Sequence, residues 1–198
     1  MLTLGIDTAD KAACVCLEAD NRLLIMKSYT GDRKHSEVLA SLVQDCLTEA
    51  GFGIADLRRI AITNGPGSFT GVRIGVSFAK GLAEGLGIPV AGVSTLQAMA
   101  SLHCTAHPVK REFACAMDAR RGQVYAAGFA PDGSRLTADE AIPLSALEGK
   151  DIVWPDTSIA YGAVLAASPM DYLPAAALLA FYLRPSQAER ERNERLAL

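Results

Sequence analysis

Residues 65–75 read GPGSFTGVRIG. An apolar stretch at 60–63 precedes this segment and predicts a short buried strand, whereas residues 70–86 have the spacing of a helix. A strand, a tight turn and a helix in this order form the repeating unit of α/β proteins. The segment therefore indicates an α/β fold in which the glycines mark the turn between a strand and a helix.

The residues around this segment extend the pattern. The chain opens with strand-like sequence, and then apolar residues at helical spacing begin near Ser36, a possible N-cap, and end at Gly51. The order β-β-β-α-β-α-β-α predicts a mixed sheet with helices that return the chain to it. The expected elements are strands at 2–8, 12–18, 22–29, 60–63 and 89–93, and helices at 36–51, 70–86 and 95–102.

A similar pattern starts again in the second half of the chain. Two expected strands, at 112–117 and 123–129, are followed by a Pro-Asp-Gly turn at 131–133. Residues 134–174 are less regular, with a short expected strand near 152–154. We therefore expect two related lobes, residues 1–107 and a smaller lobe at 108–198, with the final segment packing back on the first lobe.

Composition limits the classes of function. Half of the 198 residues are hydrophobic, and the net charge is −3 with a pI of about 5.6, which argues against a stand-alone RNA-binding protein. The alternating Glu and Arg residues of 188–198 predict a solvated helix or a frayed end. Five scattered cysteines, no basic leader and no apolar run long enough to span a bilayer predict a cytoplasmic protein.

Two glycine-containing turns could bind phosphate. Residues 5–9 read GIDTA and could follow a strand, and the second turn is the one at 65–71. Glycines let backbone amides approach an anion, and an acidic side chain could hold a magnesium-bound water. The alternative is a tight turn that needs glycine only for its backbone angles. Because no lysine follows the second turn, we assign no cofactor and keep four weak candidates: Asp7, Thr8, Gly65 and Gly67.

The expected helix at 70–86 carries two stripes. Small residues recur every fourth position from Gly71 to Ala83, and the bulky Ile74, Phe78 and Leu82 lie beside them. A helix this apolar is either buried on both sides within its own lobe or packed with one side against a partner. The sequence leaves both possibilities open.

Two of the three histidines have the spacing of a metal-binding pair. His103 and His107 stand four apart, but no third ligand shares their helical register, so we predict no metal. His35 is expected to make a local cap or an ion pair. The charged turn at 118–122, DARRG, is expected to form an internal ion pair or to contact a ligand or subunit.

Five segments together resemble the TsaB (YeaZ) family. They are GIDT at 5–8, HSE at 35–37, GPGSFTGVRIG at 65–75, DARRGQVY at 118–125 and YLR at 182–184. The resemblance implies the actin/hexokinase-like fold, here with a second lobe that we expect to be trimmed. It also implies a place in the machinery that makes threonylcarbamoyladenosine at position 37 of tRNAs reading codons that begin with A.

The resemblance further implies a non-catalytic role. The catalytic relatives of the TsaD family carry a His-x-x-x-His metal pair after a similar strand, and the two corresponding positions here hold Thr95 and Met99. Neither side chain replaces a metal-binding imidazole. The alternatives from other classes are an independent small-molecule kinase or peptidase, or a regulatory homodimer.

The partners implied are a TsaD-like catalytic subunit and a TsaE-like ATPase in the same complex. A homodimer is possible when the chain is alone, and tRNA is expected to bind only through the complex. TsaB relatives are expected to meet TsaD through helices of the first lobe. The interface residues predicted here are Leu39, Leu42, Val43, Cys46, Gly71, Gly75, Ala79 and Ala83.

Overall fold

The first half of the chain forms a five-stranded mixed sheet in the order β3-β2-β1-β4-β5 in the computed structural model, which describes residues 1–32 and 34–184. β1 is central: it pairs antiparallel with β2 and parallel with β4. The strands are β1 (Leu2–Asp7), β2 (Ala13–Ala19), β3 (Arg22–Tyr29), β4 (Arg59–Gly65) and β5 (Val90–Ser94).

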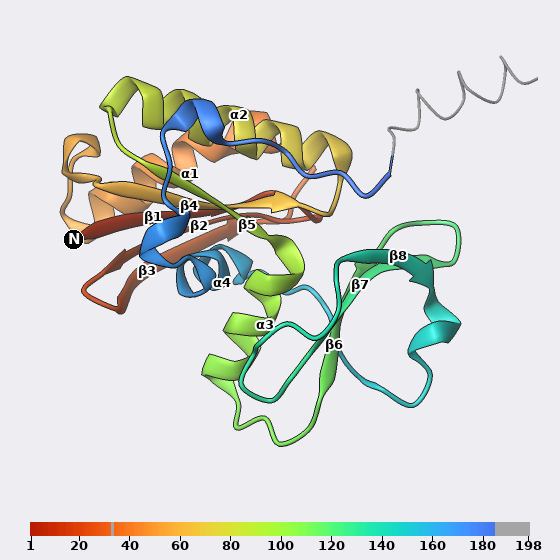
Figure 1. The fold of residues 1–198 in the computed structure, drawn as a ribbon. Coiled ribbons are helices and arrows are strands. Elements are labelled where there is room, and N and C mark those ends of the chain that lie inside the picture. Colours follow the sequence, from red (N-terminus) through yellow and green to blue (C-terminus); the bar gives the residue numbers. More distant parts are fainter. Residues whose placement is uncertain (33, 185–198) are drawn as a thin grey trace, which may run out of the picture.

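In the described part of the chain, four helices cover the two faces of this sheet. Figure 1 shows α1 (His35–Ala50) and α2 (Phe69–Leu86) on one face, and α3 (Thr95–Ala106) and α4 (Ile159–Ala166) on the other. The core beneath α1 and α2 is built from fully buried aliphatic side chains such as Leu4, Ile62 and Val72. Both faces of the central strands are therefore removed from water, which explains why these strands read as continuous apolar runs.

The second half of the chain forms a smaller sheet in the order β8-β7-β6-β9. Its strands are β6 (Phe113–Asp118), β7 (Gln123–Phe129), β8 (Glu140–Pro143) and β9 (Asp151–Val153). A second core cluster lies where α3 and α4 separate the two sheets, and Phe113 and Phe129 of the small sheet belong to it. The other face of the small sheet is covered by the short 3₁₀ turn η2 (Leu144–Leu147).

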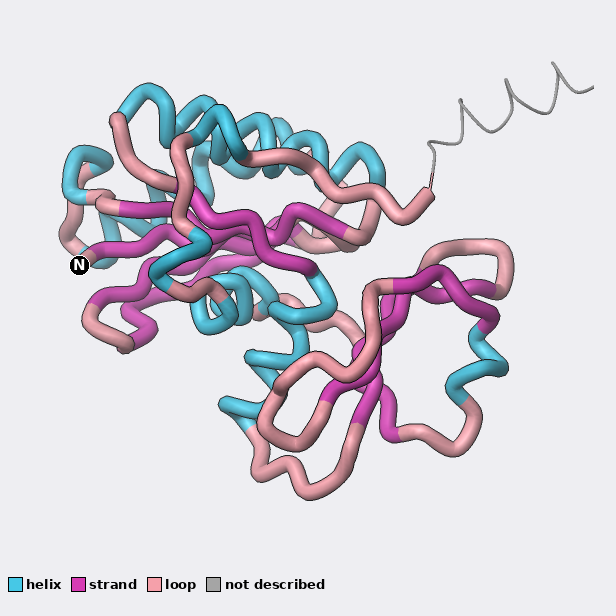
Figure 2. The backbone as a smooth tube through the Cα atoms, viewed as in Figure 1, coloured by secondary structure: helices cyan, strands magenta, loops and turns pink. Residues whose placement is uncertain are grey.

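The chain after α4 returns to the first sheet, mostly as loop (Figure 2). Leu173 pairs with Val90 at the open edge of β5. The 3₁₀ turns η3 (Pro169–Asp171) and η4 (Ala175–Ala177) lie in this segment, and η4 contacts α2. Because 169–184 runs along the first sheet and then toward the second, we call it the return segment.

The α/β architecture with two mixed sheets is confirmed. Local details differ: η1 (Ile54–Asp56) precedes β4, and α1 begins at His35 with Lys34 in the N-cap position and no side-chain cap. Ser36 therefore lies inside the helix and does not cap it. Gly51 ends α1 in the left-handed conformation, as predicted. The charge run at 188–198 lies outside the described residues.

No helix in 1–32 or 34–184 is both long and apolar enough to cross a bilayer. The division of the chain at 107/108 into two lobes stays a prediction.

Candidate functional site

The glycine-rich turn between β4 and α2 packs against the turn that follows β1. A side chain at Gly67 would overlap the carbonyl oxygen of Ala9, and one at Gly71 would overlap that of Thr8. The amide of Ser68 donates a hydrogen bond of 2.7 Å to the Ala9 carbonyl. The glycines are thus needed for close approach of two segments of the same chain.

Other groups that a phosphate would need are also engaged. The amide of Gly71 donates to Ser68 Oγ at 3.3 Å, and the Thr8 hydroxyl donates to the Gly71 carbonyl at 2.8 Å. Gly65 has a φ of 118°, and a side chain there would overlap the Phe181 carbonyl of the return segment. These contacts favour the tight-turn interpretation. Thr8, Gly65 and Gly67 stay weak candidates for phosphate binding, and no cofactor is assigned to them.

Asp7 lies at the end of β1 in the middle of this region. Its carboxylate accepts hydrogen bonds from the Thr63 hydroxyl at 2.5 Å and from the Ala9 amide at 3.3 Å. Burial raises the pKa of Asp7 from 3.8 to about 6, although both hydrogen bonds lower it. The carboxylate is therefore ionised at neutral pH, but at a cost in stability, because it is removed from water.

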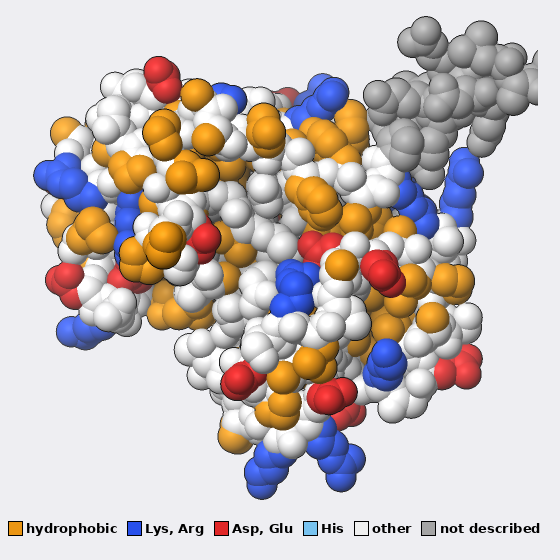
Figure 3. Space-filling view, in the orientation of Figure 1, with side chains coloured by type: hydrophobic (Ala, Val, Ile, Leu, Met, Phe, Trp, Pro, Cys, Tyr) orange, Lys and Arg blue, Asp and Glu red, His pale blue; other side chains and the backbone are white. Residues whose placement is uncertain are grey.

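Polar contacts bridge the two sheets beside this region. Ser94, at the end of β5, donates to Asp139 at 2.7 Å, and Arg135 bonds to both of these side chains. Further along, Arg184 of the return segment bonds to the Gln123 side chain at the start of β7. Figure 3 shows acidic and basic side chains together between the two parts of the molecule. These contacts hold the sheets together without a ligand.

The charged turn at 118–122 contains no ion pair between its own side chains. Asp118 instead accepts a 2.7 Å hydrogen bond from the backbone amide of Arg120, which corrects the expectation of an internal pair. Arg120 and Arg121 have φ values of 63° and 57°, and both side chains are exposed. Left-handed backbone at two consecutive arginines is strained.

The histidines do not converge on a metal site. His35 Nε2 lies 3.1 Å from the Lys11 carbonyl, 24 residues away in the sequence, which is neither the local cap nor the ion pair that was expected. The rings of His103 and His107 are 5.2 Å apart, and within 1–32 and 34–184 no cluster of three or more metal-binding side chains occurs. Thr95 and Met99 both lie buried on the inner side of α3.

The predicted interface residues require a correction, because seven of the eight are buried in their own chain. Ala79 and Ala83 are 0% and 1% exposed, and a side chain at Gly75 would overlap Thr8 Oγ1. The small stripe of α2 therefore allows close approach to the chain's own sheet. Leu42 alone is half-buried. The buried seven are Leu39, Val43, Cys46, Gly71, Gly75, Ala79 and Ala83.

The outer surface of α1 and α2 is made by other residues. The bulky stripe Ile74, Phe78 and Leu82 is half-buried and borders the exposed positions Ser77 and Gly81. The sequence pattern identified this stripe but could not tell which of the two stripes faces inward.

Comparison with known proteins supplies a family. The family model for TsaD, tRNA N6-adenosine threonylcarbamoyltransferase, matches residues 27–151. The tRNA threonylcarbamoyladenosine biosynthesis protein TsaB of Escherichia coli K12 is 42% identical over 132 residues, which are 67% of this chain and 56% of that protein. A TsaB protein of Bacillus subtilis is 34% identical over 63% of this chain and 53% of its own length.

A solved structure extends the likeness to nearly the whole chain. YeaZ from Pseudomonas aeruginosa superposes with a TM-score of 0.79 at 25% identity, covering 92% of this chain and 99% of that one. The chain spans about half the length of the curated relatives it matches, 56% and 53% for the two named above. The family model, the sequence relatives and the shared fold agree, and the chain belongs to the TsaB (YeaZ) family.

Proposed function

We propose that this chain is a non-catalytic subunit that binds a TsaD-like catalytic protein and supports threonylcarbamoylation of adenosine 37 in tRNAs reading codons that begin with A. The observation that carries the proposal is the self-packed turn at 65–71. Its glycines face carbonyl oxygens of the same chain, and amides of Ser68 and Gly71 are already bonded. A turn built in this way has few free donors with which to stabilise a transferred phosphoryl group.

The helix α3 supports the same assignment. Thr95 and Met99 replace the two histidines of the TsaD pair, and both are buried in the chain's own core. His103 and His107 lie two turns further along, and the His103 ring contacts Phe113 of the second sheet. An independent kinase or peptidase would need an activated nucleophile or a bound cation, which these positions do not supply.

The partner surface is proposed to be the outer side of α1 and α2. Ile74, Phe78 and Leu82 lie at successive helical turns, and Leu42 of α1 is half-buried as well. Helices with apolar side chains at this spacing pack against a helix of another chain by placing ridges into grooves. The small residues contribute indirectly, since they seat α2 firmly on its own sheet.

The other proposed partners follow from the complex. A TsaE-like ATPase would join the same assembly, and a homodimer through the same helices would form when the catalytic subunit is absent. We propose a cytoplasmic location. Because the net charge is −3, the chain alone should hold tRNA weakly, and tRNA should reach it through the assembled complex.

A pair of serine substitutions tests the surface. Ser77→Arg places a long charged side chain on the exposed side of α2, whereas Ser145→Arg makes the same change on the exposed turn η2 of the second sheet. Binding to the TsaD-like subunit, measured by titration calorimetry, should weaken at least ~10-fold for Ser77→Arg only. Both variants should melt like the parent. Normal binding by Ser77→Arg, or robust ATP hydrolysis by the chain alone, contradicts the proposal.

A further inference from the structure

Four arginines from three elements form no ion pair with a carboxylate in the described part of the chain. They are Arg73 of α2, Arg120 and Arg121 of the turn between β6 and β7, and Arg184 of the return segment. The first three are exposed, and Arg184 is half-buried. A guanidinium group that has no carboxylate partner keeps its charge available for an anion from outside the chain. We call these four residues the arginine rim.

Direct contacts connect the members of the arginine rim. Arg73 Nε donates a hydrogen bond of 3.2 Å to the Tyr182 hydroxyl. Two residues further along the chain, Arg184 donates a hydrogen bond of 3.5 Å to the carbonyl of Ala119, which lies in the charged turn at 118–122. Figure 1 likewise shows the end of the described return segment beside the turn between β6 and β7. The arginine rim is therefore one continuous surface that runs from the first sheet to the second.

Aromatic rings lie between these arginines. The Arg73 guanidinium is 4.1 Å from the centre of the Phe69 ring, and that ring is 4.7 Å from the ring of Tyr182. Arg184 lies 5.9 Å from the centre of the Tyr125 ring. Tyr182 is 37% exposed, so part of its ring is open to a ligand. Proteins bind single-stranded nucleic acid with this combination, because bases stack on the rings while phosphates meet the cations.

The local charge favours a polyanion although the whole chain is acidic. Asp118 is the acidic residue of the turn, and it accepts a 2.7 Å hydrogen bond from the Arg120 amide. Four arginines against this one carboxylate leave an excess of three positive charges, in a chain whose net charge is −3. Arg120 and Arg121 have φ values of 63° and 57°, and left-handed backbone at such bulky residues costs energy. Strain that is retained in this way indicates a function for the two side chains.

We propose that the arginine rim binds single-stranded RNA, with phosphates at the guanidinium groups and a base stacked on the exposed ring of Tyr182. The inference rests on the proposed function, because the RNA assigned to the rim is the loop that carries adenosine 37 of the tRNA. Loop bases are unpaired and can stack on aromatic side chains and on arginine planes. Arg73 stands four residues before Ser77 on α2, so the rim borders the proposed partner surface. RNA held there would reach the catalytic subunit.

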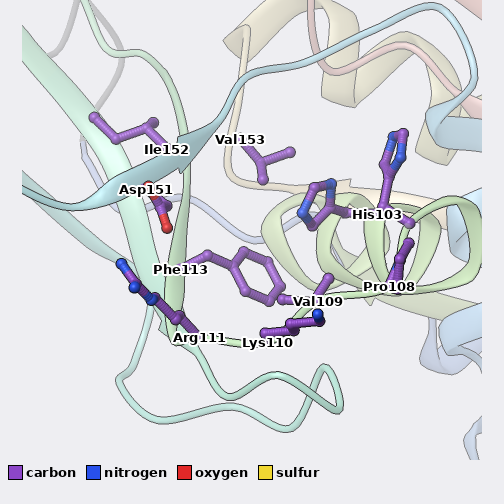
Figure 4. Close-up of a pocket in the computed structure, with 10 residues that line it drawn as sticks. His103, Pro108, Val109, Lys110, Arg111, Phe113, Asp151, Ile152 and Val153 are labelled. Carbon is purple, nitrogen blue, oxygen red and sulfur yellow. The ribbon is translucent and has the colours of Figure 1, made fainter.

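The pocket beside β9 does not offer the same combination. It has a volume of about 540 Å³ and is lined by two basic residues, Lys110 and Arg111. Figure 4 shows these two side chains pointing away from each other. The Phe113 ring between them is only 4% exposed, so its faces are not available to a base. Arg111 precedes β6, whereas the arginine rim lies beyond the other end of this strand, and Arg111 is therefore a matched control.

The probe is a fluorescein-labelled uridine dodecamer, titrated with the full chain at low ionic strength and followed by fluorescence anisotropy. Saturable but weak binding is expected. The logarithm of the association constant should fall with the logarithm of the salt concentration with a slope of about −3, because four phosphates are neutralised. An abasic strand of the same length keeps the phosphates but lacks the bases. It should bind at least fivefold more weakly, since stacking is lost.

Substitutions separate the arginine rim from the rest of the surface. Arg120→Glu and Arg121→Glu should each weaken binding of the uridine strand at least fivefold and reduce the salt slope by about 0.7 or more. Arg111→Glu, the same change at an exposed position near the other end of β6, should alter the affinity less than twofold. Tyr182→Ala should remove the preference for the uridine strand over the abasic strand and leave the salt slope unchanged.

Several results would overturn the proposal. They are the absence of saturable binding, equal binding of the two strands, or equal affinities for Arg121→Glu and Arg111→Glu in variants whose melting curves match the parent. Loss of binding to the TsaD-like subunit by Arg121→Glu, with RNA binding unchanged, would assign the arginine rim to a protein interface instead. The RNA titration uses this chain alone, so its failure is distinct from failure of the proposed function, which the Ser77→Arg variant tests.

Discussion

The two sheets share one plan but are completed differently. In each, a six-residue central strand, β1 or β6, pairs antiparallel with the next strand and parallel with the fourth. Within residues 1–32 and 34–184, the first sheet continues through β5 to Leu173, whereas no strand follows β9 in the second sheet. The strand order is thus repeated, but in this part of the chain the parallel side is extended in the first sheet alone.

The connections explain the difference. The 16-residue helix α1 links β3 to β4, but only the four-residue turn η2 lies between β8 and β9. α4, which follows β9, packs mainly against β1, β2 and β4 of the first sheet. The second sheet therefore relies on α3 for one covered face. A similar strand order does not by itself make a lobe that is stable alone, because the sheet also needs helices that cover its faces.

The largest predicted effect compares the last residues of the two central strands. Asp7 and Asp118 each accept a hydrogen bond from the amide two residues on, but Asp7 is buried and Asp118 is exposed. Since burial raises the pKa of Asp7 to about 6, folded protein binds its proton more tightly than unfolded protein, and stability falls as pH rises from about 4 to 6. Asp7→Asn should remove this fall and raise the free energy of unfolding at pH 7.5 by up to about 3 kcal/mol.

Urea unfolding at pH 4 and pH 7.5 measures this difference. The gain from Asp7→Asn should be small at pH 4, where the carboxyl is largely protonated in the folded state. Asp118→Asn is the matched control and should change the free energy of unfolding by less than about 0.5 kcal/mol at both values. A gain for Asp7→Asn that is equal at both pH values would show that burial of charge is not its cause.

A second prediction concerns how α2 is seated on the first sheet. A side chain at Gly71 would overlap the Thr8 backbone, whereas Gly81 in the same helix has open space around it. Gly71→Ala should therefore lower the free energy of unfolding by about 2 kcal/mol or more, because backbone must move. Gly81→Ala should raise it by about 0.5–1 kcal/mol through helix propensity. Thermal and urea unfolding of both variants measure these changes. If both variants are more stable than the parent, α2 does not contact the Thr8 backbone as closely as proposed.

The first sheet and its helices were predictable because their signals are local. Apolar periodicity, Gly51 and the strand-turn-helix pattern at 65–75 each depend on neighbours in sequence. The backbone groups that Gly67 and Gly71 contact could not be predicted, because Ala9 and Thr8 lie about sixty residues away in the sequence. Spacing showed that α2 has a smooth stripe, but not that Ile62 and Thr8 of the same chain fill the space against it.

The second sheet and the return segment were harder to predict. β8 and β9 have four and three residues, too few to show a period. The contacts of Phe181 and Arg184 with Asn64 and Gln123 join positions more than sixty residues apart, and no pattern in the sequence marks them. The hydrogen bonds that join Ser94, Asp139 and Arg135 form only because the fold brings these three residues together.

A third prediction tests how far the second sheet depends on the first. Arg135 bonds to Ser94 and to Asp139, whose side chain is only 7% exposed. Arg135→Ala leaves that carboxylate without its cation and should cost about 1–2 kcal/mol. Arg22→Ala, on exposed β3, should cost less than about 0.5 kcal/mol. Hydrogen exchange should show the loss mainly in β6–β8; a uniform loss over both sheets would mean that the sheets unfold as one unit.

The smallest predicted effect compares two left-handed turns. Asp20 and Asn21, between β2 and β3, have positive φ values of 51° and 61°, and Arg120 and Arg121 have values of 63° and 57°. Asp and Asn tolerate this region better than Arg, because a short polar side chain can bond to nearby backbone. Arg121→Asn should thus stabilise the fold by about 0.5 kcal/mol, and Asn21→Arg should destabilise it by a similar amount. Opposite shifts in urea midpoint at a constant m-value are the expected result. If Arg121→Asn stabilises the chain yet weakens its binding to the proposed TsaD-like partner, the strain at this turn is kept for contact with that partner. If it stabilises the chain with no change in binding, the arginines have no such role.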